Sequence, residues 1–388
     1  MMKGLAVFTP QLGTVSETFI RRHVEDLCPG RAVVVAQMSS GPLGGRWQAS
    51  CPVLFLDRWQ ARPAVRILRR LGGSNDGLRA RKVAAFLRRH RVDMVLGEYL
   101  DHFIDFVPLL DTLQIPYVVQ GHGIDLSAAL RYPEMAERYK RYRSAQNILT
   151  RCEFHRRRLI GLGLPAERIG VNPGGVDVPE RLVARGPHAA KRFLAIGRMV
   201  AKKGPIYLLQ AFRLHAEQDP DALLDYIGDG ELLSAVRQFV DAAGLTGRVR
   251  LHGAASNEVK DELLRTCGIF VQHSVTDPDT GDEEGLPAAI QEAMAHGMAV
   301  VGTKHSGISE AVEHGVTGLL VAERDTQGMA NALAHVSQTE DWRRFGANGR
   351  EKARRIYSWR AERERLLQYL APPVTAASET AVAVASPA

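Results

Sequence analysis

Residues 192–204 have the sequence RFLAIGRMVAKKG, and they show the pattern on which the fold prediction depends. An apolar run, Arg192–Ile196, is followed by a basic turn that contains glycine and then by helical periodicity over Ile206–Glu217. A short apolar run bounded by turn residues is typical of a strand buried on both faces, as in a parallel sheet. The stretch therefore predicts a strand–turn–helix unit of an α/β protein.

The same alternation of apolar runs and amphipathic stretches occurs in both halves of the chain. The first half predicts strands at Gly4–Phe8, Ala32–Ala36, Val53–Leu56, Met94–Gly97, Tyr117–Gln120, Asn147–Thr150 and Ile169–Val171. The second half predicts strands at Arg192–Ile196, Leu223–Ile227, Val249–His252, Ile269–Gln272, Ala299–Gly302 and Gly318–Val321. Helices are expected between them, among others at Thr18–Leu27, Arg79–His90 and Leu232–Ala243. We predict two α/β domains, 1–186 and 187–358, then a helix over 359–371 and a disordered tail over 372–388.

Composition agrees with a globular protein and excludes several other classes. The chain has 388 residues, of which 45% are hydrophobic and 24% are charged, and no apolar run is long enough to span a bilayer. The four cysteines lie far apart in the sequence without a Cys-x-x-Cys pair, at Cys28, Cys51, Cys152 and Cys267. This spacing favours reduced thiols in a cytoplasmic protein over a disulfide framework or a zinc site.

The net charge of +7 is unevenly distributed. Residues 1–186 carry a net charge of +11 and residues 187–388 carry −4. Within the first half, Arg58–Arg91 contains 11 Lys or Arg residues and one acid, Asp76. Basic residues beside apolar ones at helical spacing suit an anionic membrane surface, although the charged face of an ordinary helix is an alternative. Nucleic acid binding is disfavoured because aromatic residues are only 6% of the chain.

Loops after strands are where open α/β sheets bind ligands. The loop after the first strand contains a single glycine, Gly13, so it matches neither a dinucleotide fingerprint nor a Walker A loop. A later loop has the sequence QGHGID, where two glycines flank His122 and let the backbone approach a ligand. In the basic turn, Gly197 permits close approach, and Arg198 and Lys203 supply two cations suited to a diphosphate.

Residues 283–297, EEGLPAAIQEAMAHG, place two carboxylates on either side of a helix start. Pro287 is favoured as the first helical residue, so Glu284 lies in the loop and Glu292 in the helix. Carboxylates accept hydrogen bonds from pairs of sugar hydroxyls, and helix N–H groups donate to phosphate. The junction therefore suits a sugar nucleotide.

Together these motifs resemble retaining glycosyltransferase family 4, whose members have the two-domain GT-B fold. The resemblance rests on Gly-Arg-x4-Lys-Gly, on Glu-Gly-x-Pro-x4-Glu-Ala-Met-Ala-x-Gly, on Ser-Gly-Ile-x-Glu and on Gly-x-x-Gly-Leu-Leu-Val, all within about residues 190–325. Ser16-Glu17-Thr18-Phe19 and Gly121-His122-Gly123-Ile124-Asp125 further resemble the subgroup that builds exopolysaccharides such as colanic acid and amylovoran.

The resemblance implies roles for individual residues. Arg198 and Lys203 would neutralise the donor diphosphate, Glu284 would contact the donor sugar, and Glu292 the ribose hydroxyls. Gly197, Gly285, Leu286 and Pro287 would shape the donor site, and His122 would reach the transferred sugar. Gly13 would lie near the donor phosphates, although the family often has two adjacent glycines there. The resemblance also implies two Rossmann-like domains that face a cleft, and a last helix that returns to the first domain.

No cofactor or metal is expected. Asp277-Pro278-Asp279 has the Asp-x-Asp pattern of metal-dependent glycosyltransferases, but its position in a proline-containing loop before Glu284 favours a solvated acidic loop. The implied mechanism retains the anomeric configuration and depends on charge stabilisation of the departing diphosphate.

We therefore expect a cytoplasmic, peripheral membrane enzyme that transfers a hexose from a UDP- or GDP-sugar. The acceptor would be a polyprenyl-diphosphate-linked oligosaccharide in exopolysaccharide assembly, and the proposed membrane residues are Arg62, Arg66, Arg69 and Arg70. The alternatives are a soluble glycosyltransferase that acts on a small-molecule or sugar-phosphate acceptor and a catalytically silent family member that binds a sugar nucleotide.

Overall fold

The computed structural model describes residues 2–13, 18–38, 47, 49–60 and 75–372. By its contacts the chain divides into two compact units. The first contains Met1–Gln120, Arg141–Ile148 and Glu364–Ala388, and the second contains Gly121–Lys140 and Leu149–Arg363. Arg62, Arg66, Arg69 and Arg70 lie outside the described residues, as does the tail from residue 373 onward.

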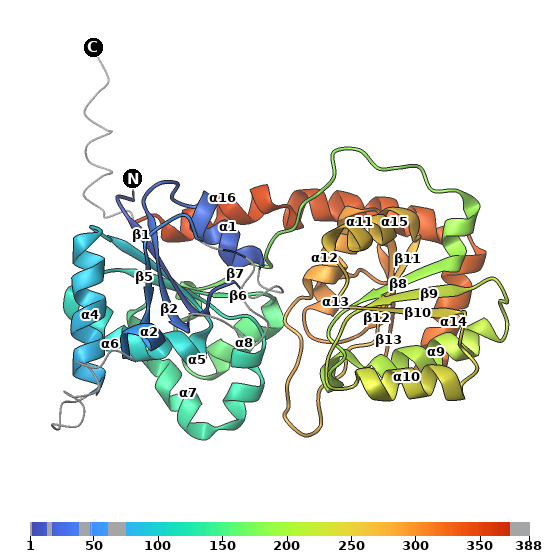
Figure 1. Ribbon diagram of the computed structural model, residues 1–388, viewed down its shortest axis with the longest axis horizontal. Helices are drawn as coiled ribbons and strands as arrows, with labels where there is room; N and C mark the ends of the chain where they lie inside the picture. The colour runs from blue at the N-terminus through green and yellow to red at the C-terminus, as the bar shows by residue number, and fades with distance from the viewer. Residues whose placement is uncertain (1, 14–17, 39–46, 48, 61–74, 373–388) are drawn as a thin grey trace, which may run out of the picture. The chain divides into compact units, whose positions relative to one another are not determined.

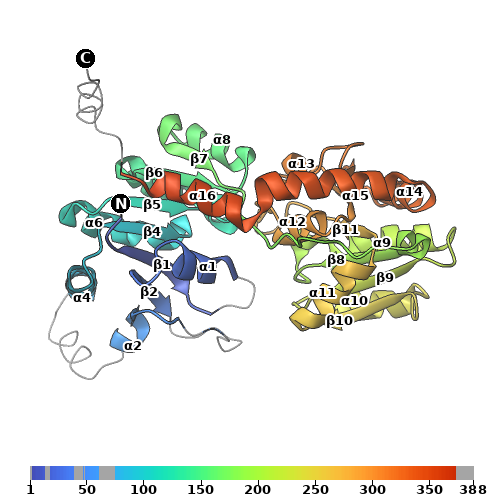
Figure 2. The same cartoon turned by 90° about the horizontal axis from the view of Figure 1, so that it is seen from above.

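The first sheet has seven strands in the order β3-β2-β1-β4-β5-β6-β7. The strands are β1 (Leu5–Gln11), β2 (Ala32–Met38), β3 (Val53–Phe55), β4 (Met94–Glu98), β5 (Tyr117–Gln120), β6 (Asn147–Thr150) and β7 (Ile169–Val171). Val7 of β1 pairs with Val34 of β2 on one side and with Leu96 of β4 on the other, in both cases in parallel. Figure 2 shows this order, with β1 between β2 and β4.

The second sheet repeats the arrangement with six strands in the order β10-β9-β8-β11-β12-β13. The strands are β8 (Arg192–Ile196), β9 (Leu223–Ile227), β10 (Val249–Gly253), β11 (Ile269–Gln272), β12 (Ala299–Thr303) and β13 (Gly318–Val321). The central strand of this sheet, β8, pairs in parallel with β9 and β11. Both sheets thus have the strand order of a Rossmann fold, in which the chain changes direction beside the central strand.

Helices connect most of the successive strands, as parallel pairing requires, whereas α14, α15 and α16 follow β13. Their bounds are α1 (Thr18–Asp26), α2 (Leu56–Gln60), α4 (Asn75–Arg89), α5 (Leu100–Phe103), α6 (Val107–Leu113), α7 (Pro133–Tyr139), α8 (Glu153–Gly161), α9 (Pro205–Ala216), α10 (Leu233–Ala242), α11 (Asn257–Thr266), α12 (Ala288–Ala295), α13 (Ile308–Ala311), α14 (Thr326–Gln338), α15 (Asp341–Lys352) and α16 (Trp359–Leu370). Within the described residues no helix is long and apolar enough to cross a membrane.

All thirteen predicted strands are present, with shifts of at most three residues at an end, as at β1. The prediction succeeds best for strands such as β4, β5 and β12, which are buried along their whole length and are rich in apolar residues. The predicted α/β class with two parallel Rossmann-like sheets is therefore confirmed.

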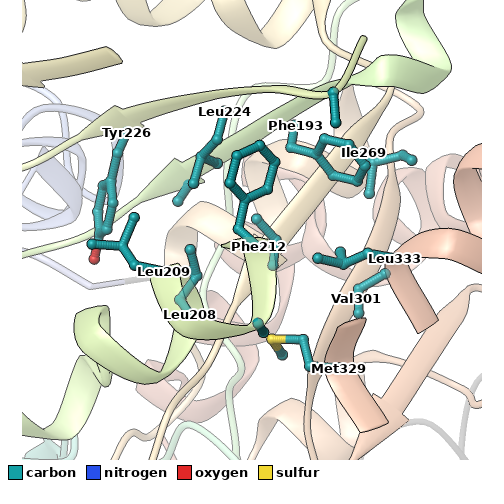
Figure 3. Close-up of a cluster of buried hydrophobic side chains, with 14 of the residues drawn as sticks. Phe193, Leu208, Leu209, Phe212, Leu224, Tyr226, Ile269, Val301, Met329 and Leu333 are labelled. Atoms are coloured by element: carbon teal, nitrogen blue, oxygen red, sulfur yellow. The ribbon is translucent and has the colours of Figure 1, made fainter. Parts of the chain in front are cut away.

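Apolar side chains cover both faces of the second sheet. Side chains of α9, α10 and α14 pack on one face, and side chains of α11, α12 and α13 pack on the other. Figure 1 shows where these helices lie beside the second sheet. On the first face the rings of Phe193 and Phe212 meet edge to face, with centroids 5.8 Å apart (Figure 3). This packing fixes the loops that follow β8 and β11, at the carboxyl edge of the sheet.

The loop after β8 approaches the loop after β9 so closely that only glycine fits between them. A Cβ atom on Gly228 would lie 1.9 Å from the Gly197 carbonyl oxygen. Gly197 in turn donates its N–H to the carbonyl of Ile227. Any side chain at position 228 must therefore displace the Gly197–Lys203 segment.

We predict that Gly228→Ala lowers the free energy of unfolding by at least about 2 kcal/mol because the clash involves backbone. The measurement is urea unfolding followed by circular dichroism. Gly186→Ala is the control, since a Cβ atom there meets nothing within 4 Å. Equal stabilities for the two variants would contradict the close approach.

Candidate functional site

The site lies at the carboxyl ends of β8 and β11, where the strand order of the second sheet reverses. Ligands of open α/β sheets bind at this position because the loops of neighbouring strands diverge there. The loop after β8 ends at Gly204, whose φ of 52° lies in the left-handed region. A Cβ atom on Gly204 would lie 2.2 Å from the carbonyl oxygen of His273, the residue after β11. Glycine is therefore required for the two loops to meet.

Two lysines before α9 contact the acidic segment that precedes α12. The Lys203 Nζ atom lies 3.1 Å from Oε2 of Glu284, and the Lys202 Nζ atom lies 2.9 Å from Oδ2 of Asp282. Lys202 also lies 3.9 Å from Oε1 of Glu284. The side chains of Lys202, Lys203 and Glu284 are all nearly buried. The structure thus joins Lys203 and Glu284, two predicted site residues, in one ion pair.

Burial and charge act in opposite directions on this pair. Burial raises the pKa of Glu284, but the neighbouring Lys203 and Lys202 ammonium groups outweigh it and hold that pKa below its ordinary value. Burial also lowers the pKa of Lys203, and the Glu284 carboxylate only partly opposes this. Each charge therefore depends on its partner to remain ionised.

A histidine and a glutamate hold the backbone of Glu284. The Glu284 N–H donates to Nε2 of His305 at 3.1 Å, and Nδ1 of His305 lies 2.5 Å from Oε1 of Glu323. Because Nε2 accepts, the neutral ring carries its proton on Nδ1 and donates it to Glu323. His305 is buried, so it fixes the turn at Glu284 from within the protein.

The turn after Glu284 is packed as closely as the loops around it. The Gly285 carbonyl accepts the N–H of Gly307 at 3.0 Å, and a Cβ atom on Gly285 would lie 3.0 Å from the His122 carbonyl oxygen. Leu286 is half-buried and Pro287 is buried. Pro287 is the N-cap of α12, with ψ of 124°, so the helix begins one residue later than predicted.

Glu292 and Arg198 are the more exposed members of the predicted site. Glu292 lies on α12, and its Oε1 atom is 2.9 Å from Nζ of Lys260 on α11. A quarter of the Glu292 side chain is exposed. Arg198 is exposed and forms no ion pair with any described residue. It directly follows Gly197, so its guanidinium is available to an anion at the end of β8.

His122 belongs to the same contact unit as Glu284. Its Nδ1 atom accepts hydrogen bonds from Nε and Nη2 of Arg151, at 3.2 and 3.0 Å. The N–H groups of His122 and Gly123 both donate to Oδ1 of Asp125. Gly123 has a φ of 135°, and its Cβ position would lie 3.2 Å from the Gly285 N atom. The loops that carry His122 and Glu284 are therefore neighbours.

Gly13 follows β1 in the first unit and has a φ of 89°, which favours glycine. Its predicted place near the donor phosphates stays a prediction.

The acidic segment Asp277–Glu283 is exposed at its tip and anchored at its base. The Asp277 carboxylate accepts hydrogen bonds from the Asp279 N–H and the Thr280 hydroxyl, within its own loop. Glu283 forms an ion pair with Arg158 at 2.8 Å. Among the described residues, no three or more His, Cys, Asp or Glu side chains are arranged to hold a metal ion.

Several residues of the site were not predicted from the sequence. Each of them contacts a residue that is distant in the sequence. These residues are Arg151, Lys202, Lys260, His305 and Glu323. Only two of them had a local signal: Lys202 is adjacent to Lys203, and His305 precedes the Ser306-Gly307 turn.

Two family models match the chain in succession. Residues 28–180 match Glycosyltransferase Family 4, and residues 183–352 match Glycosyl transferases group 1. The chain therefore belongs to the glycosyltransferases of these families, and its two sheets form the GT-B fold. The resemblance drawn from the sequence motifs is confirmed.

Curated relatives include the amylovoran biosynthesis glycosyltransferase AmsK of Erwinia amylovora. It is 35% identical over 236 residues, which are 60% of this chain and 57% of the relative. The putative colanic acid biosynthesis glycosyltransferase WcaL of Escherichia coli is 33% identical over 223 residues, which are 56% of this chain and 54% of the relative. The chain thus spans little more than half the length of these relatives.

Similar solved structures support the fold. The Anabaena protein HepE in complex with UDP matches with a TM-score of 0.77 at 20% identity. The match covers 95% of this chain and 99% of the HepE chain. A sucrose-phosphate synthase from Thermosynechococcus elongatus has a TM-score of 0.71 at 16% identity, with coverage of 99% and 100%.

We predict that Glu284→Gln lowers the free energy of unfolding by about 3 kcal/mol at pH 7, because it leaves the buried Lys203 without its acid partner. Since the pKa of Glu284 in the folded protein is below its ordinary 4.5, this stabilisation is present above pH 4.5. It is lost as the pH falls through the folded value. Urea unfolding at pH 7 and at about pH 3.5 measures the difference between the two proteins.

The control for this prediction is Glu217→Gln, which removes an exposed ion pair with Arg213. We expect it to change stability by less than about 0.5 kcal/mol. A difference between the wild type and Glu284→Gln that stays constant over the whole pH range would contradict the assignment.

Proposed function

We propose that the protein is a retaining glycosyltransferase that uses a nucleotide-diphosphate hexose. The donor is a UDP- or GDP-sugar, and the acceptor is a polyprenyl-diphosphate-linked oligosaccharide in exopolysaccharide or surface polysaccharide assembly. The proposed reaction uses no metal ion or other cofactor.

The observation that carries this proposal is the buried Lys203–Glu284 pair at the carboxyl edge of the second sheet. The Oε1 atom of Glu284 is buried and has no hydrogen-bond partner among the described residues, although Lys202 lies 3.9 Å away. A buried carboxylate oxygen in this state is an acceptor for a sugar hydroxyl. The adjacent Lys203 ammonium and the exposed Arg198 supply positive charge for a diphosphate.

The proposed chemistry assigns each group a task. The bond between the sugar C1 and the diphosphate oxygen breaks, and the nucleoside diphosphate leaves with the electron pair. The acceptor hydroxyl oxygen bonds to C1 on the same face, and its proton passes to an oxygen of the departing diphosphate. Lys203 and Arg198 stabilise the charge that develops on that diphosphate, and Glu284 holds the sugar in place. Glu292 holds the ribose hydroxyls, with Lys260 beside it.

The proposed acceptor is supported by the relatives. AmsK and WcaL are named for amylovoran and colanic acid biosynthesis. A third relative, 26% identical over 199 residues, is a galactosyltransferase whose name states a GlcNAc-diphosphoundecaprenol substrate. We extend this class of lipid diphosphate acceptor to the present chain, with a peripheral position on the inner face of the cytoplasmic membrane.

A second candidate function is transfer to a sugar phosphate. It is favoured by a 25% identical relative, the mannosylfructose-phosphate synthase of Agrobacterium fabrum, which aligns over 309 residues. Transfer to a lipid-free sugar phosphate, without transfer to a polyprenyl-diphosphate saccharide, would decide for this candidate.

The donor site is tested first by binding. In a panel of UDP- and GDP-sugars, we expect one donor to raise the thermal stability of the protein. A ligand at about 100 times its dissociation constant adds about 2.7 kcal/mol. Stabilisation by no member of the panel would contradict the proposed donor class.

With that donor, we predict that Lys203→Ala and Glu292→Ala each reduce kcat/KM by roughly 30-fold, since about 2 kcal/mol of transition-state stabilisation is lost. The matched control is Lys191→Ala, which removes a lysine–aspartate pair with Asp219. We expect the control to keep near-normal transfer. Near-normal transfer by both site variants would refute the donor-site assignment.

The membrane contact is tested with vesicles that contain anionic phospholipid. We predict that replacing Arg62, Arg66, Arg69 and Arg70 by Gln weakens vesicle binding by roughly 100- to 1,000-fold, because each of the four basic residues near the surface contributes about 1 kcal/mol. Donor binding should remain unchanged. Vesicle binding equal to that of the wild type would remove these arginines from the proposal.

A further inference from the structure

The imidazole of His122 contacts a buried arginine. Arg151 is only 7% exposed, and it directs both Nε and Nη2 at the Nδ1 atom of His122, at 3.2 and 3.0 Å. A guanidinium has donors and no acceptor. The Nδ1 atom must therefore be the acceptor, which leaves the single proton of the neutral ring on Nε2.

Arg151 is itself held by the first turns of the last helix, α16. Its Nη1 atom lies 3.3 Å from Oε1 of Glu362, whose side chain is completely buried. Asn172 Nδ2 donates to the same Glu362 oxygen at 3.4 Å. His122, Arg151 and Glu362 thus form a chain of polar contacts that begins in the loop after β5 and ends in α16.

The backbone beside Arg151 and Glu362 leaves space for their side chains. A Cβ atom on Gly174 would lie 2.4 Å from Nη1 of Arg151, so only glycine leaves room for the guanidinium. A Cβ atom on Gly175 would lie 2.9 Å from the Glu362 Cβ atom and from the Ser358 carbonyl oxygen. The turn that contains both glycines therefore fits against Arg151 on one side and against α16 on the other.

We propose that Arg151 is a positioning residue that keeps His122 in the tautomer protonated on Nε2, and that Glu362 holds Arg151 in place. The functional consequence rests on the proposed glycosyl transfer. A histidine fixed in this tautomer presents one defined donor, Nε2–H, to an oxygen of the transferred sugar. The last helix then contributes to the chemistry of the site through Glu362.

The half-buried Arg185 makes a different set of contacts. Among the described residues, Arg185 donates to backbone carbonyls at the ends of α11 and α12, those of Leu264, Arg265, His296 and Gly297. Such contacts stabilise helix ends. Arg151 instead directs two of its donors at one side-chain nitrogen, the Nδ1 atom of His122.

The tautomer can be measured directly by NMR on the full chain labelled with ¹⁵N-histidine. Long-range ¹H–¹⁵N correlations identify which ring nitrogen is protonated, and His122→Gln assigns the signal. In the wild type we expect protonated Nε2 and unprotonated Nδ1. In the double variant Arg151→Met/Glu362→Met, which removes both buried charges together, we expect the two nitrogen signals to move toward each other as the tautomers exchange.

Three controls separate positioning from folding. Thermal unfolding shows whether the double variant is folded under the conditions of the NMR measurement. The single variant Arg151→Lys keeps a cation that donates to Nδ1, so it should keep the proton on Nε2. Arg185→Met removes a half-buried arginine that does not contact His122, and it should leave the His122 signal unchanged. An unchanged tautomer in the folded double variant, or a wild-type ring protonated on Nδ1, would overturn the proposal.

Kinetics provide the link to function. In the double variant we expect kcat to fall by about 10- to 100-fold, with the KM for the nucleotide sugar changed by less than about 3-fold, because a misoriented group costs rate more than binding. Equal losses in kcat in the folded double variant and in Arg185→Met would overturn the positioning role. The tautomer measurement needs no substrate, so its result does not depend on whether the protein transfers a sugar.

Discussion

The buried contact between the Lys203 ammonium and the Glu284 carboxylate is the interaction on which the rest of the site depends. Either group alone would be costly to bury, and each pKa is governed by the balance between burial and its partner. The loop after β8 and the turn before α12 must therefore form together. Once formed, they place a cation and a carboxylate side by side at the switch point of the sheet.

The surrounding contacts keep this pair in position. His305 accepts the Glu284 N–H while it donates to Glu323, and Lys202 ties the same segment to Asp282. The backbones also approach each other without side chains between them, as at Gly204 beside the His273 carbonyl. Electrostatic stabilisation of a leaving diphosphate requires such fixed groups, because charges that must reorganise during the reaction contribute little.

The fold and the candidate site residues are predicted from local sequence, whereas the partners of those residues are not. Strands such as β8 are continuous apolar runs, and Lys203 and Glu284 lie in motifs that surround a helix start. The pairing of Arg151 with Glu362 joins residues 211 positions apart, so no local pattern indicates it. The Lys260–Glu292 pair likewise depends on how α11 packs beside α12. A charged residue in a sequence is ordinarily exposed to solvent. Only the tertiary contacts distinguish the charged partners in the candidate site from the other charged residues of the chain.

A structure of the protein with bound UDP or GDP tests the central claim most directly. The account predicts diphosphate oxygens within about 3 Å of the Lys203 Nζ atom and of the Arg198 guanidinium, and ribose hydroxyls at a similar distance from Glu292. It also predicts that Lys203 keeps its contact with Glu284, since an ammonium group has three donors. A nucleotide bound at another place, without contact to Lys203, would contradict the account.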